Sequence, residues 1–246
     1  MEFADPVDRR PIGSAVRVSV MVFDSSLFLG AVFGWPLAKG ALLTLVLSVG
    51  VMALSMVVSL FTGSCATSSR RGVRWSMASY VWLFRGAPAL LVLLFIWNGL
   101  PQLIPSFRGG WFTPFLAAFI ALTLIQIAYL TEIFRSAFAA VSSGQREGAA
   151  ALGLHRWQVF MLVVLPQALR IALPALVNEF ISLLKATSLA TIISLNELMT
   201  TTQFAIATSF QFLEWYSAAL VYYMLLVSVL TGMQMRVERV LSNGYR

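Results

Sequence analysis

Four polar side chains lie in or directly after one strongly apolar stretch of the chain, residues 159–184. Asn178, Ser182 and Lys185 are spaced to lie along one face of a helix. Glu179 lies beside that face, and an intramembrane carboxylate is a functional candidate by default. We expect this stripe to line a passage for a zwitterionic solute, whose amine the carboxylate would meet. The alternative is polar contact between helices, with Lys185 reaching the aqueous boundary.

A second pair of charges, Glu132 and Arg135, lies in the apolar stretch of residues 111–138. They are three positions apart in the sequence, so they share one helix face and can pair with each other. Glu132 is therefore a further candidate for the solute pathway, with simple pairing as the alternative.

Residues able to perform covalent or metal chemistry are scarce. The chain has one histidine, His155, and one cysteine, Cys65, so a site built from several such ligands and an internal disulfide are both excluded. It also has no Gly-x-x-x-x-Gly-Lys-[Ser/Thr] phosphate loop and no His-Glu-x-x-His motif. We expect a protein without a catalytic site, metal or cofactor, and any ATP hydrolysis that drives it must belong to another chain.

The composition shows what must position these side chains. Of 246 residues, 59% are hydrophobic and 11% are charged, whereas soluble domains are about a quarter charged. Long apolar runs approach or exceed the roughly 18 residues of a membrane-spanning helix. The sequence predicts an all-α, polytopic membrane protein with about five transmembrane helices, at residues 37–61, 75–97, 111–138, 159–184 and 212–235.

Small residues and prolines predict how these spans pack and bend. Gly40, Thr44 and Ser48 recur every four residues, which lets helix backbones approach closely. Pro88 is expected to kink or break the second span, and Pro166 and Pro174 allow the fourth to bend.

The distribution of arginine sets the expected orientation. The net charge of +7 lies mostly in loops, which is the pattern of cytoplasmic loops and does not indicate nucleic-acid binding. It predicts a cytoplasmic C-terminus, with residues 241–246 as a tail, and an external N-terminus. Residues 1–34 lack the pattern of a signal peptide and are interpreted as an extracytoplasmic or interfacial segment.

The most polar internal stretch, residues 142–166, lies between two spans and cannot lie in hydrocarbon. Ser142 and Gln145 fit a capping box, and Ala149 begins a strongly helix-forming run. Gly153 is a natural stop. We predict a short cytoplasmic helix at about residues 143–153.

This stretch resembles the signature loop of ABC importer permeases, Glu-Ala-Ala, three residues, Gly, nine residues, Ile, one residue, Leu-Pro. Two positions depart from it, Gly148 for Ala and Val163 for Ile. The segment Arg85-Gly86-Ala87-Pro88 resembles the Arg-Gly-Thr-Pro motif of the polar-amino-acid branch of that family. Further matches to that branch are Ala128-Tyr129, Glu132-Ile133, Gly144-Gln145, Leu165-Pro166-Gln167-Ala168 and residues 183–189.

The resemblance implies the ABC type I importer transmembrane fold over residues 35–240. It also implies a multi-pass permease subunit in the bacterial inner membrane, importing polar amino acids or derivatives such as opines. The short helix would dock on an ATP-hydrolysing subunit through residues Gly144, Gln145, Glu147, Gly148, Ala149 and Gly153. Implied partners are an ATP-binding subunit dimer, a second permease subunit, identical or related, a soluble periplasmic solute-binding protein, the amino-acid substrate and membrane lipid.

Two other classes compete with this interpretation. A secondary carrier driven by an ion gradient predicts inverted internal repeats, and none is evident. A membrane-embedded hydrolase needs a nucleophile and a base within the spans, and the chain has no intramembrane His or Cys pair.

Overall fold

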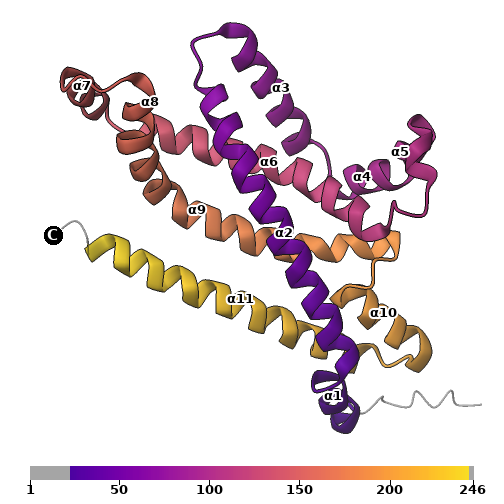
Figure 1. Ribbon diagram of the computed structural model, residues 1–246. Helices are drawn as coiled ribbons and strands as arrows, with labels where there is room; N and C mark the ends of the chain where they lie inside the picture. The colour runs from indigo at the N-terminus through magenta and orange to yellow at the C-terminus, as the bar shows by residue number, and fades with distance from the viewer. Residues whose placement is uncertain (1–22, 244–246) are drawn as a thin grey trace, which may run out of the picture.

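The fold is known from a computed structural model that describes residues 23–243 (Figure 1). These residues are helical throughout, apart from short turns. Residues 1–22 and 244–246, parts of the predicted N-terminal segment and C-terminal tail, lie outside the described range. Residues 241–243 of the predicted tail are the last turn of α11.

Four helical segments are long and apolar enough to cross a membrane. Three of them lie within single helices, α2, α6 and α11, whereas the fourth is one long segment from Arg156 to Ile193, in which α8 (Arg156–Gln158) and η3 precede α9 and η4 follows it. A bent pair of shorter helices could provide a fifth crossing, which confirms the expectation of about five. The bounds are α2 Trp35–Ala66, α6 Pro114–Ala140, η3 Val159–Val164, α9 Leu165–Ala186, η4 Thr187–Ile193 and α11 Phe212–Asn243.

The second predicted span is not one straight helix. It divides into α3 and a second helical arm, and the two arms meet at 100°. The break falls at Ala87, which is extended, and Pro88, which has no N–H to continue the helix. Pro88 therefore breaks the helix as expected, but far more sharply than a kink. The bounds are α3 Arg71–Gly86, α4 Ala89–Leu94, η1 Phe95–Gly99, α5 Leu100–Leu103 and η2 Pro105–Arg108.

The centre of the fold is α2, which crosses α6 and α10 on a face of small residues. Gly40, Thr44 and Ser48 are all buried, as their spacing predicted. A Cβ at Gly40 would lie 2.9 Å from the Cα of Leu198, and one at Gly63 would lie 2.7 Å from the Cβ of Phe134. These contacts leave no room for larger side chains, so the stripe sets how closely the helices pack.

One end of the molecule is closed by α1 (Ser25–Val32) and α10 (Leu198–Ser209), which contact α2 and α11. Asp24 caps α1 by accepting from the backbone N–H groups of Ser26 and Leu27. The hydrogen bond from the Ser26 hydroxyl holds the pKa of Asp24 below its usual range. The Asp24 N–H in turn donates to Glu214 of α11 at 2.9 Å, so α1 is fixed to the helical bundle.

Glu197 holds α10 in place and is fully buried. Its carboxylate accepts from the backbone N–H of Thr200 at 2.8 Å and of Met199 at 2.9 Å. The same carboxylate accepts longer bonds from Thr44 of α2, at 3.5 Å, and Tyr223 of α11, at 3.4 Å. One side chain therefore connects three helices. Glu197 lies between the fourth and fifth predicted spans and was not among the candidate residues from the sequence.

Candidate functional site

The short helix predicted between the third and fourth spans is present as α7 (Ser143–Ala151), followed by α8 (Arg156–Gln158). Both lie at the end of the molecule opposite α1 and α10 (Figure 1). Gly153 has φ +84°, and its N–H donates to Ala150 while that of Leu154 donates to Ala149. This is the glycine-terminated helix end expected from the sequence, and it ends α7 sharply.

The predicted capping box of Ser142 and Gln145 is wrong. Ser142 caps α7 without a side-chain hydrogen bond. The Gln145 side chain points elsewhere, and its carbonyl oxygen accepts from Gln167 of α9 at 3.5 Å. A capping box instead forms at the start of α8, where Gln158 accepts from the backbone N–H of His155 at 2.9 Å.

Two contacts seat α7 on the transmembrane helices. The guanidinium of Arg146 donates to the carbonyl of Phe138 at the end of α6. Ala149 is 7% exposed and faces the interior of the subunit. The remaining predicted docking positions, Gly144, Gln145, Glu147, Gly148 and Gly153, are all exposed. The outward surface of α7 is therefore small, rigid and short of bulky side chains, except for Leu152 after its end.

A polar cavity of about 650 Å³ lies between α3, α6 and α9. Glu132 and Glu179, two of the predicted pathway residues, line it together. Arg85 and Tyr129 line it as well, with the guanidinium 5.2 Å from the ring centroid of Tyr129, a cation–π contact. The cavity thus presents one cation and two carboxylates to the same space.

A second cavity of about 320 Å³ adjoins the first, because Tyr129 and Glu179 line both. Gln126 and Ser182 add polar groups to it. The two cavities thus follow one another along the interface of α6 and α9, each with polar side chains in its lining. Glu179 lies where they meet.

The remaining predicted pathway residues do not line these cavities, and Glu132, which does, has an ion-pair partner. Asn178 and Lys185 are exposed and line neither cavity. Glu132 pairs with Arg135 through two hydrogen bonds of 2.9 and 2.5 Å, the simple pairing considered from the sequence.

Arg85 and Tyr129 were not singled out as pathway residues from the sequence. Arg85 was assigned to a structural motif, and it reaches the cavity because α3 ends there against α6. The available signal was its charge within an apolar run, which marks a functional candidate in a membrane.

Of the prolines and the glycine assigned to structural motifs, only Gly86 and Pro88 lie at a break between helices. Gly86 is the last residue of α3, and Pro88 precedes α4. Pro166 stands in the first turn of α9, directly after the π-helical η3, and Pro174 lies inside α9.

Residues 55–242 match the family described as binding-protein-dependent transport system inner membrane component. That range covers most of the chain, including α7 and both cavities. The chain belongs to this family. As an inner membrane component with four to five candidate spans, it is a multi-pass membrane permease.

Curated relatives of this permease are similar over most of their length. The glutamine transport system permease protein GlnP of Escherichia coli (strain K12) is 35% identical over 209 residues, covering 83% of this chain and 94% of GlnP. The arginine ABC transporter permease protein ArtQ of the same strain is 33% identical, covering 78% of this chain and 89% of ArtQ. The probable amino-acid permease protein YxeN of Bacillus subtilis (strain 168) is 33% identical over 83% of this chain and 90% of YxeN.

Solved structures agree with the fold of the permease. A chain of an amino acid ABC transporter crystallised with histidines aligns with a TM-score of 0.78 at 29% identity, covering 89% of this chain and 99% of that one. A chain of the MetNI methionine ABC transporter aligns with a TM-score of 0.73 at 19% identity, a likeness of fold alone. The transmembrane fold of ABC importers, expected from the signature loop, is confirmed.

Proposed function

We propose that this permease is the transmembrane subunit of an ATP-driven ABC importer for polar amino acids or derivatives such as opines. The observation that carries the proposal is α7, an exposed, rigid helix of small residues at the position of the family signature. Relatives named for arginine and glutamine transport support the substrate class. The two carboxylates of Glu132 and Glu179 and the guanidinium of Arg85 line the larger cavity, and they suit a solute that carries both a positive and a negative charge.

The proposed assembly follows from what the chain lacks and from its size. The sequence has no phosphate loop, so ATP hydrolysis would belong to a separate subunit dimer. A soluble periplasmic binding protein would deliver the substrate, and a second permease, identical or related, would complete the path. In the bacterial inner membrane, α7 and the C-terminus would face the cytoplasm and the N-terminus the exterior, in line with the arginine distribution.

The contacts of α7 suggest how motion would reach the spans. A push on its exposed face would pass to α6 through the bond from Arg146 to the Phe138 carbonyl. It would pass to α9 through the contact of Gln145 with Gln167. Because α6 and α9 border both cavities, their relative movement would open or close the path around Glu179.

The proposal is tested by expressing the permease with its genomic neighbours and purifying it from the membrane. We expect a nucleotide-binding subunit to co-purify, and uptake of labelled amino acids into proteoliposomes to require enclosed ATP. Uptake that persists without ATP while an ion gradient is present would contradict the proposal and favour a secondary carrier.

Glu179 gives a direct test of the solute path. Glu179→Gln removes the charge at the junction of the cavities but keeps the side-chain volume. We expect uptake of the preferred amino acid to fall about tenfold or more, since a charged hydrogen bond contributes about 1.5–3 kcal/mol. The measurement is initial uptake rate across acidic, neutral and basic amino acids.

Glu179→Asp, which keeps the carboxylate, is the matched control and should retain a larger share of the uptake. An unchanged uptake profile for Glu179→Gln would show that Glu179 makes only helix contacts. It would leave the transporter class untouched.

A further inference from the structure

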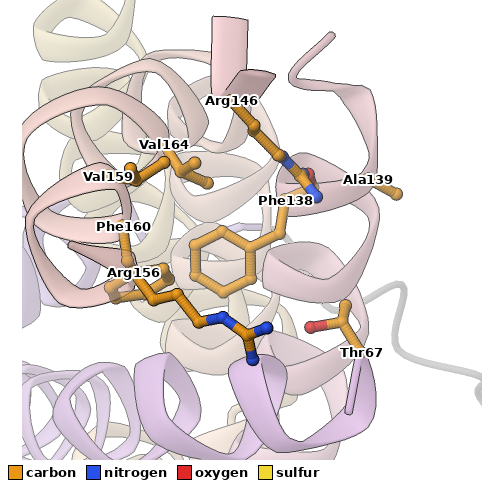
Figure 2. Close-up of a pocket in the computed structure, with 8 residues that line it drawn as sticks. All are labelled: Thr67, Phe138, Ala139, Arg146, Arg156, Val159, Phe160 and Val164. Carbon is orange, nitrogen blue, oxygen red and sulfur yellow. The ribbon is translucent and has the colours of Figure 1, made fainter. Parts of the chain in front are cut away.

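A third cavity, which shares no lining residue with the two that border Glu179, lies beside α7. It has a volume of about 360 Å³ and lies between the ends of α2 and α6, helices α7 and α8, and η3. We call it the arginine pocket, and Figure 2 shows the eight residues that line it. Arg146 and Arg156 enter it from different helices, on either side of the ring of Phe138.

The charge of the arginine pocket is unbalanced. Acidic side chains are absent from its lining, and within residues 23–243 neither arginine has a carboxylate partner. Arg146 donates one hydrogen bond to the Phe138 carbonyl, although a guanidinium has five N–H donors. The Arg156 side chain extends beneath the Phe138 ring toward Thr67 and makes no hydrogen bond within the described part of the chain (Figure 2). Two guanidinium groups and a hydroxyl thus border one space that holds no counter-charge.

An apolar groove of about 440 Å³ adjoins this pocket, and Phe160 lines both. We call it the α2 groove, because Val57, Phe61 and Ser64 of α2 form one side of it. Trp157 and Leu165 contribute to the other side. Val57 and Phe61 are about 70% exposed and belong to a helix that is long and apolar enough to cross a membrane. The groove therefore offers an apolar surface to an acyl chain, and Phe160 is the residue that it shares with the arginine pocket.

The dimensions match a single lipid in one leaflet. From Val57 to Thr67, α2 rises by about 15 Å at 1.5 Å per residue. That is about half of the roughly 30 Å hydrocarbon core. Trp157 lines the groove and is 67% exposed, and exposed tryptophans gather at the headgroup level. The arginine pocket therefore lies at the depth of lipid phosphates.

We propose that the arginine pocket and the α2 groove together bind one anionic phospholipid. Its phosphate accepts hydrogen bonds from the guanidinium groups of Arg146 and Arg156, and an acyl chain occupies the groove past Phe160. Basic pockets between helices at the membrane surface commonly bind such headgroups. A soluble anion would use the pocket but leave the groove empty, so the continuity of the two favours a lipid.

The residues of the proposed lipid site come from several different helices. Arg146 belongs to α7 and Arg156 to α8, while the groove belongs to α2. One lipid would thus bridge the loop to a transmembrane helix. The proposal does not rest on the proposed transport function, because it concerns binding to the folded subunit alone.

Trp157 allows a direct measurement. The complete permease, with any subunits that accompany it, is solubilised in detergent and titrated with phosphatidylglycerol carrying brominated acyl chains, which quench tryptophan on contact. The Trp157→Phe variant is titrated in parallel, so that subtraction isolates the signal of the groove from the other tryptophans. Brominated phosphatidylcholine tests the need for net negative charge, and inorganic phosphate tests whether a free anion competes.

We expect phosphatidylglycerol to quench Trp157 at lower lipid fractions than phosphatidylcholine, and millimolar phosphate not to compete. Arg156→Gln should raise the half-saturating fraction of phosphatidylglycerol about fivefold, and adding Arg146→Gln about twenty-five-fold, at about 1 kcal/mol per arginine. Arg71→Gln, an exposed arginine outside the pocket, is the matched control and should change it by less than about twofold. Because Arg156 makes no internal hydrogen bond in the described residues, its variant should fold normally.

Four results would overturn the proposal. An equal effect of Arg71→Gln would show that general surface charge, and not the arginine pocket, attracts the lipid. Equal quenching by phosphatidylcholine would show an ordinary lipid-facing surface, and full competition by phosphate would show a site for soluble anions. Absence of any Trp157 quenching in the wild type would show that a protein segment covers the groove.

Discussion

Replacing Glu147 with tryptophan is expected to abolish ATP-driven uptake while the permease still folds and inserts. Glu147 is exposed on α7 and makes no side-chain hydrogen bond within residues 23–243, so the subunit itself loses little. The flanking positions Gly144 and Gly148 have open space around them, which leaves this face flat. A bulky indole there would hold a docking partner away from α7, and motion could no longer pass to α6.

The measurement separates two activities of the purified complex in proteoliposomes, ATP hydrolysis and amino-acid uptake. We expect uptake to fall about a hundredfold while ATP hydrolysis continues, a loss of coupling equivalent to about 3 kcal/mol. Glu147→Gln keeps the size of the side chain and removes only the charge, so its milder defect would assign the large effect to bulk. Full uptake by Glu147→Trp would disprove the docking role of α7.

Gly153 provides an independent test of the same surface from the end of α7. Because its φ is +84°, any replacement pays a conformational cost, which would be confused with an effect of size. Gly153→Asn is the informative control, since asparagine tolerates this conformation. Only Gly153→Trp should lose coupling if the surface around α7 receives a partner.

The sequence was sufficient for features that depend on local chemistry. Gly153 ends α7 because glycine readily adopts a positive φ. Pro88 interrupts the helix after α3 because it has no backbone N–H to donate. The small-residue stripe around Gly40 predicted close packing, since small side chains serve few other purposes on a membrane helix. None of these features depends on which helix lies opposite.

The residues around the proposed solute path could not be predicted in the same way. Helical spacing grouped Asn178 with Ser182 and Lys185, but spacing cannot tell which flank of that face meets α6. The fold turns Glu179 and Ser182 into the cavities and leaves Asn178 and Lys185 outside. Arg85 joins them because α3 ends against α6, a tertiary contact that the local sequence does not specify.

Glu197 shows a second limit of sequence reasoning. Its neighbours are Ser, Thr and Asn residues that are typical of a loop, and a carboxylate before a helix is usually an exposed cap. Here the cap is buried, because α2 and α11 close over it with Thr44 and Tyr223. The tertiary contacts turn a local capping residue into the junction of three helices.

Glu197→Ala is accordingly expected to lower the free energy of unfolding by about 3 kcal/mol, the second large effect. The substitution removes the cap of α10 and leaves buried N–H groups of Met199 and Thr200 without acceptors. It also releases the hydroxyl groups of Thr44 and Tyr223. The measurement is the thermal unfolding midpoint of the detergent-solubilised permease, which should drop by several degrees.

Two companion variants identify which contacts matter. Glu197→Asp can still cap α10 but is too short to reach Thr44 and Tyr223 as well, so its loss should be intermediate. Thr44→Val removes one long bond of 3.5 Å together with the acceptor at 3.3 Å for the N–H of Leu198, and should cost about 1–2 kcal/mol. If Glu197→Ala were no less stable than Thr44→Val, the carboxylate would not be the group that holds α2, α10 and α11 together.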